Sequence, residues 1–145
     1  MKIRVNLKVD KKTFDDFYNT TERILVKVYD YGLEGLEAIG VDVLEESAEL
    51  CPVDTATLVN TKYISDPQYD RGVLKLGIGY ASPQSDRMNP QTGEFASEYA
   101  LEVHEDPTYA HEPGKTYRFL AIAILNYEKK DLVLADYLRR ALSDG

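Results

Sequence analysis

The residues best suited to metal chemistry are two histidines, each followed by a glutamate, at His104-Glu105 and His111-Glu112. A metalloprotease helix carries His-Glu-x-x-His, so that both imidazoles hold zinc from one face. Neither pair continues in that way, because a proline follows and the second histidine is missing. A looser site formed by His104, Asp106, His111 and Glu112 is conceivable, since imidazole and carboxylate suit several divalent metals. The histidines have no fixed spacing, so we expect surface or interface roles and predict no metal and no cofactor.

Other catalytic patterns are weaker. The glycine pattern Gly77-x-Gly79-x-x-Ser82 lacks the third glycine of a dinucleotide loop, and Pro83 follows where a helix should begin. The one cysteine, Cys51, lies at the end of an acidic helix, which predicts a raised thiol pKa and a weak nucleophile. No phosphate-binding loop is present, and no spacing places a Ser-His-Asp set together. We therefore predict that the chain is not an enzyme.

Length and composition favour one soluble domain. A chain of 145 residues is long enough to form a single core. Its formal charge of −8 argues against a dedicated nucleic-acid binder, which would show a basic patch. The first residues lack a signal-peptide core, and the longest apolar run, Phe119–Leu125, is too short to span a bilayer. We expect one domain over residues 1–145, made in a cytoplasm and without a membrane partner.

The longest coherent pattern is a helical stripe between Phe14 and Leu50. An unbroken helix of this length would span roughly 55 Å, at about 1.5 Å per residue. Glycines inside it favour a bend or split near Tyr31–Gly35, or the close approach of a neighbouring backbone. Thr13 is a candidate cap, and Pro52 ends the helix because the residue before a proline leaves helical geometry. The stripe comprises Phe14, Phe17, Thr21, Leu25, Val28, Gly32, Leu36, Ile39, Val43, Ser47 and Leu50.

The other face of this helix is acidic. No Lys or Arg occurs between residues 28 and 61. Ordinary solvation produces such a face, and so does a surface that meets a basic partner or faces DNA without holding it. The sequence leaves both interpretations open. The residues of this acidic face are Asp30, Glu34, Glu37, Glu45 and Glu49.

Alternating patterns before and after the helix predict strands. In Lys2–Val9 every second residue is apolar, which is typical of a half-buried strand. Further strands are predicted at 61–65, 73–80 and 99–104. A final helix is predicted over Tyr117–Leu142, capped by Thr116 and with a break allowed within 126–131. Clustered strands predict an α+β fold, in which an antiparallel sheet of about four strands packs against the long N-terminal helix and a C-terminal helix.

The stretch at about 82–97 is the part of the sequence least suited to regular structure. It contains Pro83, Pro90 and Gly93 and few large apolar residues. Loops of this length in compact domains are usually functional or disordered, and we expect this one to become ordered only against a neighbouring subunit. Its candidate assembly residues are Gln84, Arg87, Met88, Asn89 and Phe95.

Three segments together resemble one family of bacteriophage proteins. Ala48–Leu58, AELCPVDTATL, is similar to the A-x-x-x-P-V-D-T-G-x-L signature of tail-completion and head–tail joining (neck) proteins of long-tailed phages. Tyr99–Glu105, YALEVHE, resembles the strand Y-A-x-x-(V/F)-(H/E)-(E/F) of that family, and its Val-His-Glu form resembles the related phage minor capsid proteins. His111–Leu120, HEPGKTYRFL, resembles the P-x-(K/R)-F-L-x-x-A entry to the last helix. Ala56 and Val59 stand where the family signature has Gly and Arg.

The resemblance implies a non-enzymatic virion part located at the neck or tail. Such proteins form a homo-oligomeric ring, typically a hexamer, between the head connector and the tail tube or a neighbouring neck protein. The genome DNA passes through the lumen without specific binding, and an acidic wall would repel its phosphates. The residues that carry the resemblance are Pro52, Val53, Asp54, Thr55, Leu58, Tyr99, Ala100, His104, Glu105, Phe119 and Leu120.

The alternative is a cytoplasmic adaptor. In this interpretation the acidic helix face binds one basic partner, and the binding depends on salt. The sequence does not decide between the two, nor does it say whether the acidic face meets the lumen, the solvent or a neighbouring subunit.

Overall fold

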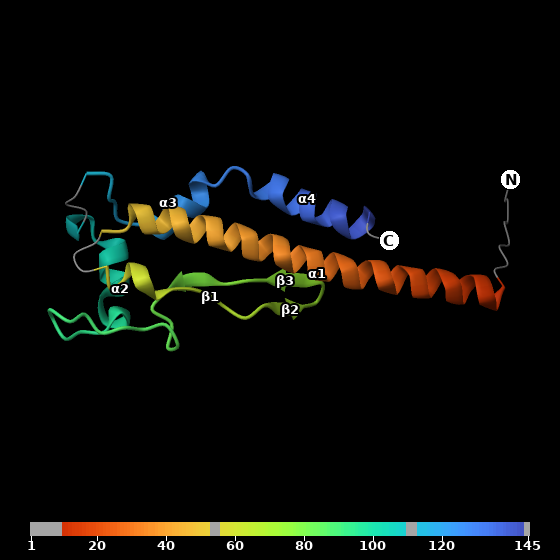
Figure 1. Ribbon diagram of the computed structural model, residues 1–145, viewed down its shortest axis with the longest axis horizontal. Helices are drawn as coiled ribbons and strands as arrows, with labels where there is room; N and C mark the ends of the chain where they lie inside the picture. The colour runs from red at the N-terminus through yellow and green to blue at the C-terminus, as the bar shows by residue number, and fades with distance from the viewer. Residues whose placement is uncertain (1–9, 53–55, 110–112, 144–145) are drawn as a thin grey trace, which may run out of the picture.

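The computed structural model describes residues 10–52, 56–109 and 113–143, and its centre is the helix α1 (Lys11–Leu50). Figure 1 shows α3 and α4 along one side of α1 and the strands along the other, with α2 at the end where α1 finishes. The predicted strand Lys2–Val9 lies outside the described residues. The predicted α+β fold with antiparallel strands is confirmed. The other elements are η1 (Val59–Thr61), β1 (Lys62–Ile64), β2 (Gln68–Asp70), β3 (Val73–Lys75), β4 (Ile78–Tyr80), α2 (Ala96–Glu105), η2 (Pro107–Tyr109), α3 (Phe119–Asn126) and α4 (Lys130–Ser143).

The helix α1 is continuous over 40 residues, so the split that was one of the alternatives predicted near Tyr31–Gly35 is wrong. Its first turn is capped by the carboxylate of Asp10, which accepts a hydrogen bond from the backbone N–H of Thr13 at 2.9 Å. The predicted cap, Thr13, therefore lies inside the helix, and its hydroxyl donates to the same carboxylate. At the other end Cys51 has extended backbone angles, φ −65° and ψ 131°, as expected before Pro52.

Two glycines in α1 let neighbouring elements pack closely against the helix instead of bending it. A Cβ atom at Gly35 would lie 3.2 Å from side-chain atoms of Leu134 and Tyr137 in α4. A Cβ atom at Gly40 would lie 3.1 Å from the side chain of Ile78 in β4. Side chains, rather than the neighbouring backbone that we expected, fill the space that the glycines leave.

The strands form two antiparallel pairs, β1 with β4 and β2 with β3. The single strand predicted over residues 73–80 is divided, since β3 ends at Lys75 and β4 begins at Ile78. Between them the backbone N–H of Gly77 donates to the hydroxyl of Ser65 at 2.8 Å, and the N–H of Ser65 donates to the carbonyl of Gly77. The Ser65 side chain thus interrupts the ladder, and one long hairpin becomes two short pairs.

The strand predicted over Tyr99–His104 is wrong, because this segment lies within the helix α2. Every second residue is large and apolar, but burial follows the helical period, with Ala96 buried and Leu101 exposed. The carboxylate of Glu98 fixes the helix start by accepting a hydrogen bond from the N–H of Phe95 at 2.7 Å. Capping and tertiary packing therefore outweigh the alternation.

The C-terminal helical region consists of α3 and α4, so the break allowed within residues 126–131 is confirmed. Thr116 does not cap it. The chain enters α3 through Arg118, whose φ of 53° lies in the left-handed region. Both helices pack against α1 on the side opposite the strands, as Figure 1 shows.

The two halves of α1 have different surroundings. Residues 27–50, the packed half, carry buried side chains such as Val43 and Leu44 between the strands and the C-terminal helices. Residues 11–26, the projecting half, extend to and beyond the end of α4 (Figure 1), and Phe17 is 70% exposed there. Exposed apolar residues do not make α1 a membrane span: within the described ranges, no helix is long and apolar enough to cross a bilayer.

Candidate assembly interface

The segments that carry the three family-like motifs meet at one end of the molecule, beside α2 (Figure 1). Their buried side chains, together with that of Ala96, form one core, the motif cluster, which consists of Cys51, Leu58, Ala96, Val103 and Phe119. Tyr99, Ala100 and Leu120 pack against this cluster and are partly buried. Residues that lie far apart in the sequence therefore share one structural unit. Val53, Asp54 and Thr55 lie outside the described residues.

Phe119 is the largest fully buried side chain of the motif cluster. The ring of Tyr80 meets it edge-on at 5.4 Å between centroids, and the ring of His104 does so at 4.9 Å. The backbone also joins α2 to the start of α3, because the N–H of Arg118 donates to the carbonyl of His104 at 2.5 Å. Phe119 thus fixes α3 against both α2 and β4.

The side chain of His104 is part of this joint. Its Nδ1 atom lies 2.7 Å from one carboxylate oxygen of Glu105, and the other oxygen accepts a hydrogen bond from Nε of Arg118 at 3.3 Å. The hydrogen bond with His104, followed by the hydrogen bond and the positive charge of Arg118, holds the pKa of the Glu105 carboxyl below its usual value. The Nε2 atom of His104 is buried and has no hydrogen-bond partner among the described residues. This arrangement positions α2 and α3.

No group of three His, Cys, Asp or Glu residues within the described ranges is placed to hold a metal ion. His111 and Glu112, two members of the conceivable metal site, lie outside those ranges. The thiol of Cys51 is fully buried, and this burial raises its pKa to about 12. The predicted direction of the thiol shift is confirmed, although burial in the motif cluster is its main cause rather than the acidic helix.

Pro52 and Leu58 frame the turn that follows α1. Ala56, at the position where the family signature has glycine, has a φ of 59°, a left-handed conformation that favours glycine. Leu58 is buried in the motif cluster, and its carbonyl accepts a hydrogen bond from the hydroxyl of Thr61 at 2.6 Å. The hydroxyl oxygen of Thr61 also accepts the N–H of Ala81 at 3.1 Å, so this turn is joined to the chain just after β4.

The loop at 82–95 has its own hydrogen bonds, which corrects the expectation that it is unstructured without a neighbour. Asp86 accepts hydrogen bonds from the backbone N–H and the hydroxyl of Ser97 at the start of α2. Hydrogen bonds from Ser97, led by its hydroxyl, lower the pKa of the Asp86 carboxyl. Ser85 donates its hydroxyl to the carbonyl of Thr61 at 2.9 Å. The sequence did not single out Asp86 or Ser85, because their partners are distant in the chain.

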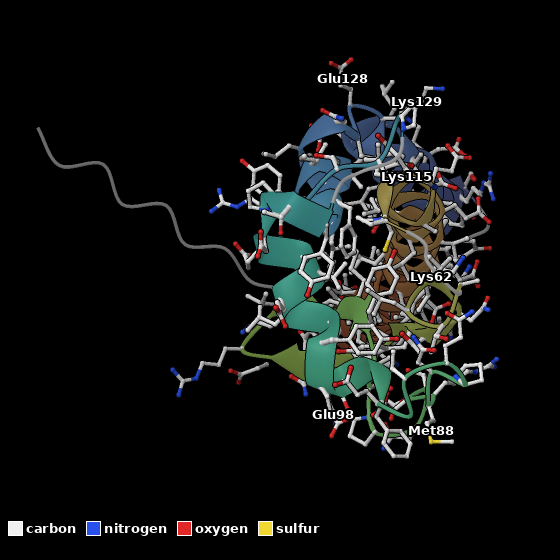
Figure 2. The ribbon with its side chains drawn as sticks, turned by 90° about the vertical axis from the view of Figure 1, so that its left-hand side faces the viewer. Lys62, Met88, Glu98, Lys115, Glu128 and Lys129 are labelled. Atoms are coloured by element: carbon white, nitrogen blue, oxygen red, sulfur yellow. The ribbon has the colours of Figure 1, made fainter. Side chains whose placement is uncertain are left out.

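Within the loop, the predicted assembly residues divide into one buried and four exposed positions. Asn89 is buried, and its side-chain oxygen accepts the N–H of Gln91 at 2.9 Å. Met88 and Phe95, joined by an isolated β-bridge, are 55% and 48% exposed, and they form the exposed apolar pair. Figure 2 looks onto this end and shows Met88 and Glu98 at one edge, opposite Glu128 and Lys129. Gln84 and Arg87 are also exposed.

A cavity of about 230 Å³ lies between the loop and the motif cluster. Its lining includes Leu58, Asn89, Glu94, Tyr99, Val103 and Tyr109. Tyr99 of α2, Thr57 of the turn after α1 and Asn89 of the loop line it together. The loop is therefore attached to α2 and to the turn after α1, and it presents its exposed apolar pair from a fixed base.

The acidic face of α1 lies in the open, since Asp30, Glu34, Glu37, Glu45 and Glu49 are all exposed. Near the helix end, the ammonium group of Lys115 donates a hydrogen bond to the carbonyl of Glu49 at 2.8 Å. The structure keeps this face apart from the motif cluster, because the cluster forms on the sides of α1 that meet β4 and α3. Comparison with protein-family models, curated proteins and solved structures finds no match to the chain.

Proposed function

We propose that the chain is a structural subunit of a tailed bacteriophage, working as a ring of identical copies at the neck between the head connector and the tail tube. The observation that carries the proposal is the motif cluster, in which residues from all three family-like segments pack together. This contact supports the resemblance, because the three segments then belong to one structural unit.

The exposed apolar pair supports an assembly role for the same end of the molecule. Met88 and Phe95 stand on a loop that is attached to α2 through Asp86 and Ser97. Exposed apolar side chains on a fixed loop lose little conformational freedom when a partner covers them, so they suit a protein contact. In the proposed ring, this pair meets the neighbouring neck protein or the connector.

Net charge supports passage of DNA rather than its retention. The chain has a formal charge of −8, and proteins that hold DNA neutralise phosphates with Lys and Arg. A ring of such subunits would repel the phosphate backbone and let the genome slide. The proposed function therefore requires no enzyme activity, cofactor or DNA-binding site.

Copy number in purified virions tests the proposal directly. Quantitative mass spectrometry should give a low, ring-like ratio of this chain to the portal protein. A count in the hundreds would place the chain in the capsid shell or the tail tube instead. Its absence from virions would reject the neck role.

A loop variant tests the contact. Replacing Met88 and Phe95 together by Ser should leave the subunit folded but block head–tail joining, counted as separate heads and tails by electron microscopy. Gln91→Ser, at an exposed position of the same loop that is not among the candidate assembly residues, is the matched control and should assemble normally. Deleting the loop is a poorer test, because it would also remove the bonds that Asp86 and Ser85 make to α2 and Thr61.

The second candidate is the cytoplasmic adaptor, and the exposure of all five acidic-face residues favours it. Reversing Glu37, Glu45 and Glu49 to Lys should then abolish binding of the basic partner and remove its salt dependence. Unchanged binding by this triple variant would reject the adaptor role.

A further inference from the structure

The cavity between the loop and the motif cluster, the tyrosine pocket, has the size and the lining of a small binding site. Its volume of about 230 Å³ lies below the roughly 300–1,000 Å³ of sites for drug-sized ligands, so it suits a group the size of one amino-acid side chain. Two tyrosines, Tyr99 and Tyr109, line it. Pro52, Leu58 and Val103 contribute an apolar part of its wall.

Two polar groups of the tyrosine pocket can accept hydrogen bonds from a ligand but cannot donate them. Among the described residues that line the pocket, Glu94 alone has a formal charge, and an ionised carboxylate only accepts. The hydroxyl of Tyr109 donates its single hydrogen to the carboxylate of Glu102 at 3.0 Å, which leaves only lone pairs on its oxygen. A ligand that meets Glu94 and Tyr109 must therefore be a hydrogen-bond donor.

The electrostatic environment of the two tyrosine hydroxyls is negative. Burial is the main cause that raises the pKa of Tyr99, and the negative charge of Glu94 adds to the rise. The hydrogen bond to Glu102, followed by burial and by the charges of nearby carboxylates that include Glu94, raises the pKa of Tyr109. No Lys or Arg is found among the described residues that line the pocket, so no positive side chain of the lining offsets these charges. The pocket therefore favours a cationic donor over a neutral or an anionic one.

The backbone that carries Glu94 is held by the hydrogen bonds of a tight turn. The carbonyl of Glu94 accepts the N–H of Asn89 at 2.7 Å, and the N–H of Glu94 donates to the hydroxyl of Thr92 at 3.3 Å. Gly93 has a φ of 78°, and its N–H donates to the carbonyl of Asn89 at 2.8 Å. Because the turn is formed before a ligand arrives, binding at Glu94 has to order little more than one side chain.

We propose that the tyrosine pocket binds a primary alkylammonium group, the group that a lysine side chain and a free alkylamine share, with its methylenes against the apolar wall and its ammonium between Glu94 and Tyr109. An ammonium has three donors and one positive charge, and aromatic side chains bind such cations. Glu94 directly precedes Phe95 of the exposed apolar pair, so a protein that covers this pair can place a lysine in the pocket. The inference goes beyond the neck role and does not depend on it.

Four ligands with the same butyl chain test the chemistry of the pocket by ligand-observed NMR titration of the purified full chain. n-Butylammonium should bind saturably, n-butanol should bind at least about fivefold more weakly because it lacks the charge, and butyrate should not bind. Butylammonium that binds no better than butanol, or does not bind, would overturn the inference. Tighter binding of n-butylguanidinium would also overturn it, because the pocket would then suit an arginine-like group.

A charge-neutral variant tests the place of binding. Glu94→Gln keeps the shape of an exposed side chain but removes its charge, so it should weaken the binding of n-butylammonium by about fivefold while the circular dichroism spectrum stays unchanged. Glu128→Gln is the matched control, because Glu128 is also exposed and lies at the edge of this end opposite the loop residue Met88 (Figure 2). The control should bind as the wild type does. Equal affinity of the wild type and Glu94→Gln would overturn the inference.

Two further ligands distinguish the sources of the ammonium group. Nα-acetyl-lysine N-methylamide carries the lysine side chain on a blocked backbone, and butane-1,4-diamine is a free amine of similar length. Tighter binding of the blocked lysine would assign the pocket to a protein partner, and tighter binding of the diamine would assign it to free amines. Either result supports an alkylammonium site, and failure of both ligands to bind would overturn it. Virion copy number judges the neck role separately, so a chain that is absent from virions but binds the amine loses that role and keeps the pocket.

Discussion

The two halves of α1 carry the same apolar stripe but use it differently. In the packed half the stripe meets α4 and the strands, and Val43, which belongs to it, is 3% exposed. In the projecting half Leu25 is 62% exposed. Apolar periodicity therefore specifies that a segment is helical, but it does not specify whether the partner of its apolar face belongs to the same chain.

Substituting one leucine in each half should give the largest difference in stability between the two halves. Leu44→Ala leaves a cavity in the packed half and should lower the free energy of unfolding by roughly 2–5 kcal/mol. Leu25→Ala, the same change on the same helix, should alter it by no more than about 0.5 kcal/mol. Urea unfolding of the dilute chain, followed by circular dichroism, measures both. Equal losses would mean that the projecting half is packed within the subunit.

At alkaline pH, ionisation of a buried tyrosine in the packed region should lower stability, whereas ionisation of an exposed tyrosine in the projecting half should not. Burial raises the pKa of Tyr80 and of Cys51 to about 12, above the ordinary values of 10.0 and 9.0. Because the folded-state pKa values are raised, the stability that these groups contribute is complete below about pH 9 and is lost as the pH rises towards 12. The pKa of the exposed Tyr18 is raised mainly by a hydrogen bond with Glu22. Ionisation of Tyr18 should therefore cost little folding stability.

The measurement is the urea midpoint between pH 7.5 and pH 10.5. Tyr80→Phe should flatten the alkaline decline, although it also leaves the hydroxyl of Ser47 without its partner at 2.6 Å. Tyr18→Phe is the matched control and should leave the decline unchanged. A decline that disappears with Tyr18→Phe instead would contradict the assignment to the buried groups.

Two glycines of α1 offer a finer test of how closely the C-terminal helices approach. A Cβ atom at Gly32 would lie 3.9 Å from Leu138, an ordinary contact, so Gly32→Ala should stabilise the fold by about 0.5–1 kcal/mol through helix propensity. At Gly35 the added atom would lie 3.2 Å from Leu134 and Tyr137. Gly35→Ala should therefore be less stable than Gly32→Ala by roughly 1–2 kcal/mol. Thermal unfolding of the two variants compares them, and equal stability would show that α4 shifts away from α1 without a loss of stability.

The elements predicted correctly from sequence are those whose signals are local. The long helix ends at Pro52 because a proline restricts the residue before it, and the break between α3 and α4 falls within the polar stretch. The helix α2 was missed because alternation of large apolar residues can mimic a strand. Its decisive signal, Glu98 three residues after Phe95, needs the knowledge that Phe95 begins a helix.

The site was harder to predict, because its key bonds are not local. The loop was expected to be unstructured, yet Asp86 is bonded to Ser97 and Ser85 to Thr61, across 11 and 24 residues of sequence. No periodicity reveals a bond of that kind. The motif residues, in contrast, carry a signal in the local sequence, and Leu58, Tyr99 and Phe119 share one core region.

The smallest expected effect concerns the cap of the projecting half. Asp10→Ala removes the carboxylate that accepts the N–H and hydroxyl of Thr13, a change that usually costs about 0.5–2 kcal/mol of helix stability. Here the described chain provides little packing around the first turns, so the loss should appear as local fraying rather than global unfolding. Hydrogen exchange should quicken over residues 11–20 while the urea midpoint stays constant. A lowered midpoint would mean that the first turns of α1 are coupled to the core, and the two halves would then form one cooperative unit.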